Sequence, residues 1–245
     1  FTRGHLLELT LGVRGGVGTR IEQIAAEMLV RRVLGDRLFE TWVGAVHALP
    51  APRAGALRVL DVHAPRAQLG LEELFATVAA AARGVLAGLP PLPHAERRAA
   101  EDWTLLEVEP LAGARGIRKD DLVLASTCTP ELLRCFLDGA PCSSRRFSRV
   151  GETFVYVSYA DAVPSATARV ARRALLEARV SEGLEGVGAV TGVGLGVGTT
   201  YIDCVLSDLD VGLQRLVLAL RQLELPTQAV VHFFDSELAD EWLAI

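Results

Sequence analysis

The order of strand-like and helix-like segments limits the fold of this chain more than any other feature of its sequence. In the N-terminal half, strand-like segments at 5–13, 38–49, 56–64 and 103–111 surround helix-like segments at 19–34 and 71–86. In the C-terminal part, strand-like segments at 153–160, 186–194, 199–207 and 228–234 surround helix-like segments at 164–180 and 208–223. Both parts therefore follow the order β-α-β-β-α-β, which is typical of the ferredoxin-like motif.

We therefore expect an α+β protein built from tandem ferredoxin-like repeats, each with an antiparallel sheet and helices on one face. The first repeat is expected over 1–111 and the second over 153–245, while 112–152 connects them through a short helix. Similar strands at 43–49 (VGAVHAL) and 187–193 (VGAVTGV) support an internal duplication. Because many unrelated activities occur on this fold, the fold alone does not indicate a function.

The composition favours a chain with a large core and no membrane anchor. Half of the 245 residues are hydrophobic, and the mean hydropathy is +0.31. Arginines such as Arg83 and Arg215 interrupt the most apolar helices, so we predict no transmembrane segment. The remaining apolar excess favours buried interfaces between domains or subunits, and a homo-oligomer is one expectation.

Cysteine content and basic composition indicate a cytoplasmic bacterial protein. Four cysteines in 245 residues do not resemble a disulfide framework, and no signal peptide is visible. Lys119 is the only lysine beside 24 arginines, which is typical of a GC-rich bacterial genome. No close pair of cysteines has zinc-site spacing, so neither a metal nor a cofactor is predicted.

Negative charge is concentrated in the C-terminal part of the chain. The net charge is −5, and residues 151–245 alone carry 6 arginines and 13 acidic residues. This region would repel nucleic-acid phosphates and suits a basic protein partner. Strand alternation also places two tyrosines and an aspartate on the sheet face away from the helices, where tyrosine favours protein contacts. The candidate partner-binding residues are Tyr156, Tyr201, Asp203, Asp208, Asp240 and Trp242.

The glycine cluster between the first strand and the first helix is a candidate anion site. Its spacing matches neither the dinucleotide fingerprint nor the P-loop. Thr19 and Glu22 form a capping box, so a helix is expected to begin here, and helix N-termini attract anions. A simple turn that leads into a capped helix is the alternative. The candidate ligand-binding residues in Gly12–Thr19 and beside it are Arg14, Gly15, Gly16, Gly18, Thr19 and Arg20.

A second glycine-rich stretch, GVGLGVGTT at 192–200, allows two interpretations. A loose hairpin loop is the favoured one, because glycine is common in turns. Alternatively, glycines at every second position leave one face of a strand without side chains, which lets another group approach closely.

Nucleophilic or metal-assisted chemistry is a further alternative with less support. Cys128 directly precedes the helix that begins at Pro130, where the helix N-terminus would stabilise a thiolate. The histidines that fall on expected strands are His5, His47, His63 and His232. His47 and His63 belong to consecutive strands, and Asp61 shares a face with His63, so these three are a candidate metal or acid–base site.

These features lead to three hypotheses of function. The leading one is a non-enzymatic protein-interaction module that binds a partner through its acidic second repeat, by analogy with toxin-neutralising immunity proteins and other inhibitory binding proteins. The first alternative is a small-molecule or anion-sensing regulatory protein that uses Gly12–Thr19. The second is an enzyme that uses Cys128 or the strand histidines.

Overall fold

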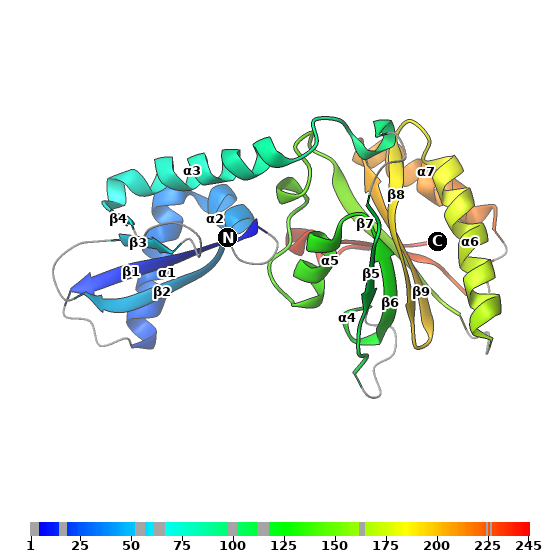
Figure 1. Cartoon of the computed structure of the whole chain (residues 1–245), viewed down its shortest axis with the longest axis horizontal. Coiled ribbons are helices and arrows are strands. Elements are labelled where there is room, and N and C mark those ends of the chain that lie inside the picture. Colours follow the sequence, from blue (N-terminus) through cyan, green and yellow to red (C-terminus); the bar gives the residue numbers. More distant parts are fainter. Residues whose placement is uncertain are drawn as a thin grey trace. The chain divides into compact units, whose positions relative to one another are not determined.

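Two compact units, Phe1–Leu89 and Pro90–Ile245, make up the chain in its computed structural model (Figure 1). The structure describes residues 5–14, 19–51, 57–60, 67–97, 102–111, 118–161, 165–223, 225 and 227–245. The division falls earlier than the expected end of the first repeat at residue 111. The reason is that β5 (Thr104–Glu107) pairs with β6 (Leu122–Thr127) in the sheet of the second unit.

In its described residues, the first unit combines one mixed sheet with three helices. Its elements are β1 (Leu7–Arg14), α1 (Arg20–Leu34), α2 (Asp36–Trp42), β2 (Val43–Ala51), β3 (Leu57–Leu60), β4 (Ala67–Leu69) and α3 (Leu71–Gly88). The segment at 38–49, expected to be a strand throughout, begins as helix α2. Phe39 and Trp42 are spaced three residues apart and are both buried in the core, which favours a helical turn there.

Strand pairing in the first unit differs from a ferredoxin-like repeat. The sheet order is β2-β1-β3-β4, and β1 pairs in parallel with β2 as a direct neighbour. In a split β-α-β motif another strand would separate these two strands. The segment at 103–111, expected to complete this sheet, instead contains β5 of the second unit. A tandem of equivalent repeats is therefore not confirmed, whereas the α+β class is.

The second unit is built on a seven-stranded antiparallel sheet. After the 3₁₀ turn η2 (His94–Glu96) and β5 come α4 (Arg118–Asp121), β6, α5 (Pro130–Leu137), η3 (Ser144–Arg146), β7 (Thr153–Ala160), α6 (Ala166–Gly183), β8 (Gly188–Gly196), β9 (Thr199–Leu206), α7 (Leu209–Arg221), β10 (Val230–Phe233), η4 (Ser236–Leu238) and β11 (Trp242–Ala244). The strand order is β11-β10-β7-β9-β8-β6-β5. Strand β9 lies between β7 and β8, so β7-α6-β8 is a split β-α-β unit.

Both faces of this sheet are covered, which corrects the expectation of helices on one face only. On one face, Val155, Val157 and Ile202 pack with residues of α6 and α7. The other face is covered by α5, through Leu132 and Leu133, and by the segment after it, through Phe147 (Figure 1). The strand alternation was assigned correctly, but the region at 112–152 supplies a second layer rather than a simple connection.

None of the helices in the described part of the chain combines the length and the apolar composition that a bilayer crossing requires.

Candidate functional site

A buried ion pair lies at the centre of the face that α5 covers. Arg118, the first residue of α4, places Nη2 2.7 Å from Oδ2 of Asp203 on β9, and Nη1 2.5 Å from Oδ1. Their side chains are only 1% and 3% exposed, respectively. Such a pair requires close charge compensation, because removing either charge from water is costly.

Aromatic rings surround the guanidinium of Arg118. Its central carbon lies 4.5 Å from the ring centre of Tyr156, 5.1 Å from that of Phe234, 5.2 Å from that of Tyr201 and 5.8 Å from that of Phe136. These rings come from β7, the loop after β10, β9 and α5. Their electron-rich faces stabilise a cation at such distances. The fold thus gathers one cation and four rings from distant parts of the sequence.

Glycines on β8 make room for the polar groups of this face. A Cβ on Gly192 would lie 2.6 Å from Oδ2 of Asp203, and one on Gly196 would lie 1.9 Å from Oδ2 of Asp121. Asp121 accepts a hydrogen bond from the hydroxyl of Tyr201 at 2.9 Å. These glycines lie within a strand and allow close approach, so the less favoured interpretation of this stretch is the one the structure supports.

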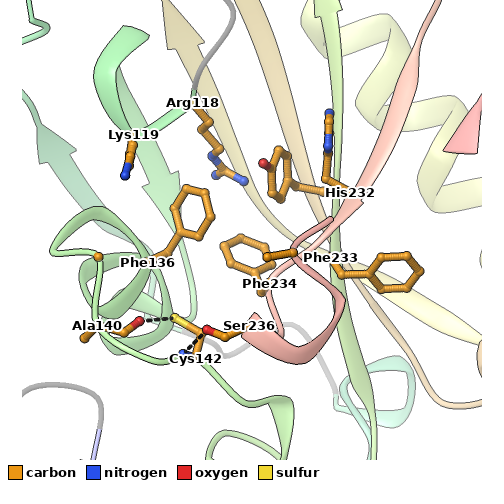
Figure 2. A pocket seen from close by; sticks show the side chains of 12 residues that line it. Arg118, Lys119, Phe136, Ala140, Cys142, His232, Phe233, Phe234 and Ser236 are labelled. Carbon is orange, nitrogen blue, oxygen red and sulfur yellow. Dashed lines mark hydrogen bonds between the residues drawn. The ribbon is translucent and has the colours of Figure 1, made fainter. Parts of the chain in front are cut away.

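A pocket of about 370 Å³ opens beside the ion pair. Its lining includes Arg118, Lys119, Phe136, Tyr156 and Phe234. Figure 2 shows the Arg118 side chain and the rings of Phe136 and Phe234 converging on the same space. Ligand sites in proteins commonly have volumes of about 300–1,000 Å³ and combine apolar walls with a few polar groups.

The guanidinium of Arg118 has a buried nitrogen beside the pocket that lacks a hydrogen-bond partner among the described residues. The Nε of Arg118 is buried and has no hydrogen bond within the described residues. The other end of the guanidinium faces Asp203, so Nε is the donor left for an additional acceptor. Because a buried donor without a partner costs free energy, an acceptor bound in the pocket would be favoured.

His232 on β10 adds a neutral wall to the pocket. Its ring stacks on Tyr156 with 4.9 Å between centroids, and its Nε2 lies 3.1 Å from the hydroxyl of Ser158. Burial and, secondarily, the charge of Arg118 lower the pKa of His232 below its ordinary value. The imidazole is therefore uncharged near pH 7.

The expected partner-binding residues separate into a buried group and an exposed group. Tyr156, Tyr201 and Asp203 do lie on the expected sheet face, but they are 9%, 0% and 2% exposed because α5 covers them. Asp208, Asp240 and Trp242 are exposed. Asp208 also has a structural role, since its carboxylate caps α7 at Val211 N. Three of the six residues are therefore covered by α5, and the other three lie at the surface.

The expected anion site is only partly described. Gly15, Gly16 and Gly18 lie outside the described residues, and Arg14 ends β1. Thr19 and Arg20 are exposed at the start of α1. The capping box is confirmed, since Glu22 N donates to Thr19 Oγ1 at 3.3 Å and Thr19 N donates to Glu22 Oε2 at 2.8 Å.

The residues expected for enzyme chemistry do not form a described cluster. Cys128 follows β6, and His232 lies on β10, four strands away in the sheet order. At about 4.8 Å per strand, this is a separation of roughly 19 Å. Asp61 and His63 lie outside the described residues, and His5 and His47 belong to the first unit. Within the described ranges, no three potential ligand side chains group as a metal site.

A separate apolar surface lies on α1 in the first unit. Ile21, Ile24 and Met28 are 79%, 50% and 66% exposed, and Leu29 is 39% exposed. Helix α1 instead buries Ala26, Val30 and Leu34. The spacing of Ile21, Ile24 and Met28 places them along one face of the helix. We call the four exposed residues the α1 apolar face.

Sequence reasoning missed Arg118 and Asp121 as members of the site. Their partners, Asp203 and Tyr201, are 85 and 80 residues away along the chain. The one sequence signal was the alternating glycines at 192, 194 and 196, which marked a strand face with space for other groups. A comparison with protein-family models finds no match, and comparisons with curated proteins and with solved structures find none either.

Proposed function

We propose that the second unit binds a small monoanion with a flat apolar body, such as an aromatic carboxylate. The observation that carries this proposal is the buried Nε of Arg118, which has no hydrogen-bond partner among the described residues and lies beside a pocket with aromatic walls. A ligand carboxylate would accept this hydrogen bond, and the rings of Phe136 and Phe234 would contact its apolar body.

The charges of the pocket favour an anion over a neutral or cationic ligand. The charge of Arg118 is offset by Asp203, whereas Lys119 adds a further positive charge to the lining. One negative charge on the ligand would balance Lys119. This proposal retains the expectation of a small-molecule or anion sensor but moves the site from Gly12–Thr19 to the second unit.

Ligand binding is tested by thermal unfolding and calorimetry of the full chain with phenylacetate and benzoate, each compared with its neutral amide. We expect the carboxylates to stabilise the protein, by about 2.7 kcal/mol when the ligand concentration is 100 times Kd. The amides should have at least tenfold weaker affinity, because they lack the charge that Lys119 and Arg118 favour. Equal binding of acid and amide, or no binding of either, would contradict the proposal.

Variants locate the site without removing the buried ion pair. Lys119→Gln and Phe136→Leu should weaken phenylacetate binding by about tenfold each, since a lost charge or packing contact is worth about 1.4 kcal/mol. Arg149→Gln is the matched control, because Arg149 is an exposed cation outside the pocket lining. An equal effect of Arg149→Gln would show that the anion binds non-specifically.

Protein binding is a second candidate function, favoured by the α1 apolar face. Contiguous exposed apolar side chains commonly mark protein-interaction sites. This proposal retains the leading hypothesis of an interaction module but moves the contact from the acidic second repeat to α1. Asp240 and Trp242, both exposed, remain candidates for a contact with a basic partner.

The protein-binding proposal is tested with the double variant Ile24→Glu/Met28→Glu, compared with Arg32→Glu on the same helix as a control. Both changes affect exposed residues, so the fold should remain intact. Light scattering after size-exclusion chromatography would report self-association, and affinity purification from the native host would report other partners. If the double variant has the same mass by light scattering and the same co-purifying proteins as the wild type, a role for the α1 apolar face is contradicted.

A further inference from the structure

Two cysteines that are seven residues apart in sequence, Cys135 on α5 and Cys142 in the segment after it, bring their sulfur atoms together. Helix α5 is followed by Gly139, whose φ of +67° is a conformation that favours glycine and turns the chain back. The returning segment places Sγ of Cys142 3.2 Å from Sγ of Cys135. A disulfide bond is about 2.05 Å long, so the two sulfurs need to approach by only about 1.1 Å.

A buried arginine lies against this pair. Arg146 in η3 is fully buried and places Nη2 3.3 Å from Sγ of Cys135. The same nitrogen donates to the carbonyl of Pro141, which holds the guanidinium in place. A positive charge beside a thiol stabilises the thiolate, which is the reactive form of cysteine.

The two thiols differ in acidity because of this arrangement. The hydrogen bond from Cys142 and the charge of Arg146 outweigh burial and lower the pKa of Cys135 to about 7. The pKa of Cys142 is raised, first by this same shared hydrogen bond and then by burial. One thiolate and one thiol therefore coexist near neutral pH, which is the combination that disulfide formation uses.

Small molecules in the pocket would meet the pair at Cys142, because Cys135 is fully buried behind it. Cys142 lines the pocket described above, on the side opposite Lys119 (Figure 2). Its backbone is fixed, since Cys142 N donates to Ser236 Oγ at 2.8 Å and Ser236 N donates to Cys142 O at 2.9 Å. Cys204 does not line this pocket and packs in the core on the helix-covered face of the sheet.

We propose that Cys135 and Cys142 are an oxidation site at which a small hydroperoxide forms an intramolecular disulfide. The Cys135 thiolate attacks the O–O bond, which breaks to give a Cys135 sulfenic acid and an alkoxide or hydroxide that takes up a proton. The Cys142 sulfur then attacks the sulfenic sulfur, and water leaves. In sum, two thiols lose two electrons and two protons, and the hydroperoxide becomes an alcohol and water, or two waters when it is hydrogen peroxide.

The experiment uses the reduced full chain, a small excess of hydrogen peroxide, removal of the peroxide, alkylation of the remaining thiols in denaturant, and tryptic mass mapping. Cleavage after Arg134 and Arg145 releases one peptide that contains both cysteines, CFLDGAPCSSR. We expect this peptide to lose two hydrogens and to resist alkylation, while Cys128 and Cys204 are alkylated. Subsequent treatment with a dithiol reductant should restore both thiols.

Single variants separate the two steps. Cys142→Ser should stop at the Cys135 sulfenic acid, which dimedone traps, and Cys135→Ser should form no disulfide. Cys128→Ser is the matched control and should form the disulfide at the wild-type rate. The proposal is overturned if the 135–145 peptide remains fully alkylated after peroxide treatment, or if a disulfide forms instead with Cys128 or Cys204.

Discussion

Arg118 and Asp203, 85 residues apart in sequence, form a two-point ion pair inside the second unit, with the Nη2–Oδ2 distance at 2.7 Å. Because both side chains are almost fully buried, neither charge has water to replace its partner. We predict that Asp203→Asn lowers the free energy of unfolding by about 3–5 kcal/mol, since it leaves the guanidinium uncompensated. Urea unfolding followed by circular dichroism measures this loss.

The matched control for the ion pair is Glu185→Gln, which removes an exposed carboxylate and should change stability by less than about 0.5 kcal/mol. Replacing both partners, as Arg118→Met/Asp203→Leu, should recover much of the loss, because no buried charge then remains. A double variant as unstable as Asp203→Asn would show that desolvated charge is not the cause.

Two neighbouring glycines of the β8–β9 hairpin should respond differently to the same substitution. A Cβ on Gly196 would lie 1.9 Å from Oδ2 of Asp121, whereas one on Gly198 would have no atom within 4 Å. Gly196→Ala should therefore destabilise the protein by about 1–3 kcal/mol through overcrowding. Gly198→Ala should have an effect below about 0.5 kcal/mol. Thermal unfolding of the two variants compares them directly, and equal stabilities would contradict the strand assignment of this stretch.

The N-terminal cap of α1 should contribute measurably to the first unit. Thr19 Oγ1 accepts a hydrogen bond from Glu22 N, which satisfies one of the free N–H groups at the start of the helix. We predict that Thr19→Ala costs about 1 kcal/mol, while Thr19→Ser, which keeps the hydroxyl, costs much less. Denaturant unfolding measures both, and equal losses for Ala and Ser would exclude the cap as the cause.

Glu152 should make the stability of the second unit sensitive to acid. Its carboxylate accepts hydrogen bonds from His94 N at 2.7 Å and Ser148 Oγ at 2.9 Å, and its Oε2 lies 2.9 Å from His94 Nδ1. Burial raises the pKa of Glu152, but these hydrogen bonds outweigh burial and lower the pKa below its ordinary value.

A carboxyl whose pKa is lower in the folded state stabilises the protein above its unfolded pKa of about 4.3. This contribution is lost as the pH falls through the lower, folded-state pKa. We predict that Glu152→Gln is less stable than the wild type at pH 7 and that the difference narrows in acid. Urea unfolding at pH 7 and at several pH values below 5 measures the difference in stability between the two proteins. A difference that does not change with pH would show that protonation of Glu152 is not coupled to stability.

Local sequence signals predicted most of the elements in the second unit. The segments expected at 153–160, 199–207 and 208–223 appear as β7, β9 and α7 with nearly the same bounds. Their patterns are strong because each element buries one face, so apolar side chains recur with the period of the strand or helix. The helix caps at Thr19 and Asp208 were also predicted from the sequence, because capping depends on residues within one helical turn.

Local patterns were insufficient where long-range pairing decided the outcome. The first unit has elements similar to those of an expected ferredoxin-like repeat, yet β1 pairs in parallel with β2, and β5 joins the other sheet. The similar VGAV segments lie at the start of β2 and across the start of β8, which belong to sheets of different topology. Strand partners depend on which surfaces the whole chain can bury. The sequence of a short segment does not specify its partner strand.

The sequence by itself determined the α+β class, the caps, and which side chains of β7 and β9 face α6 and α7, because these follow from residues close together in the chain. Only the tertiary structure decided that α5 covers the opposite face and that Arg118 meets Asp203 among four aromatic rings. The physical reason is that a buried charge is stable only where partners from several distant segments converge, and this convergence exists only in the folded chain.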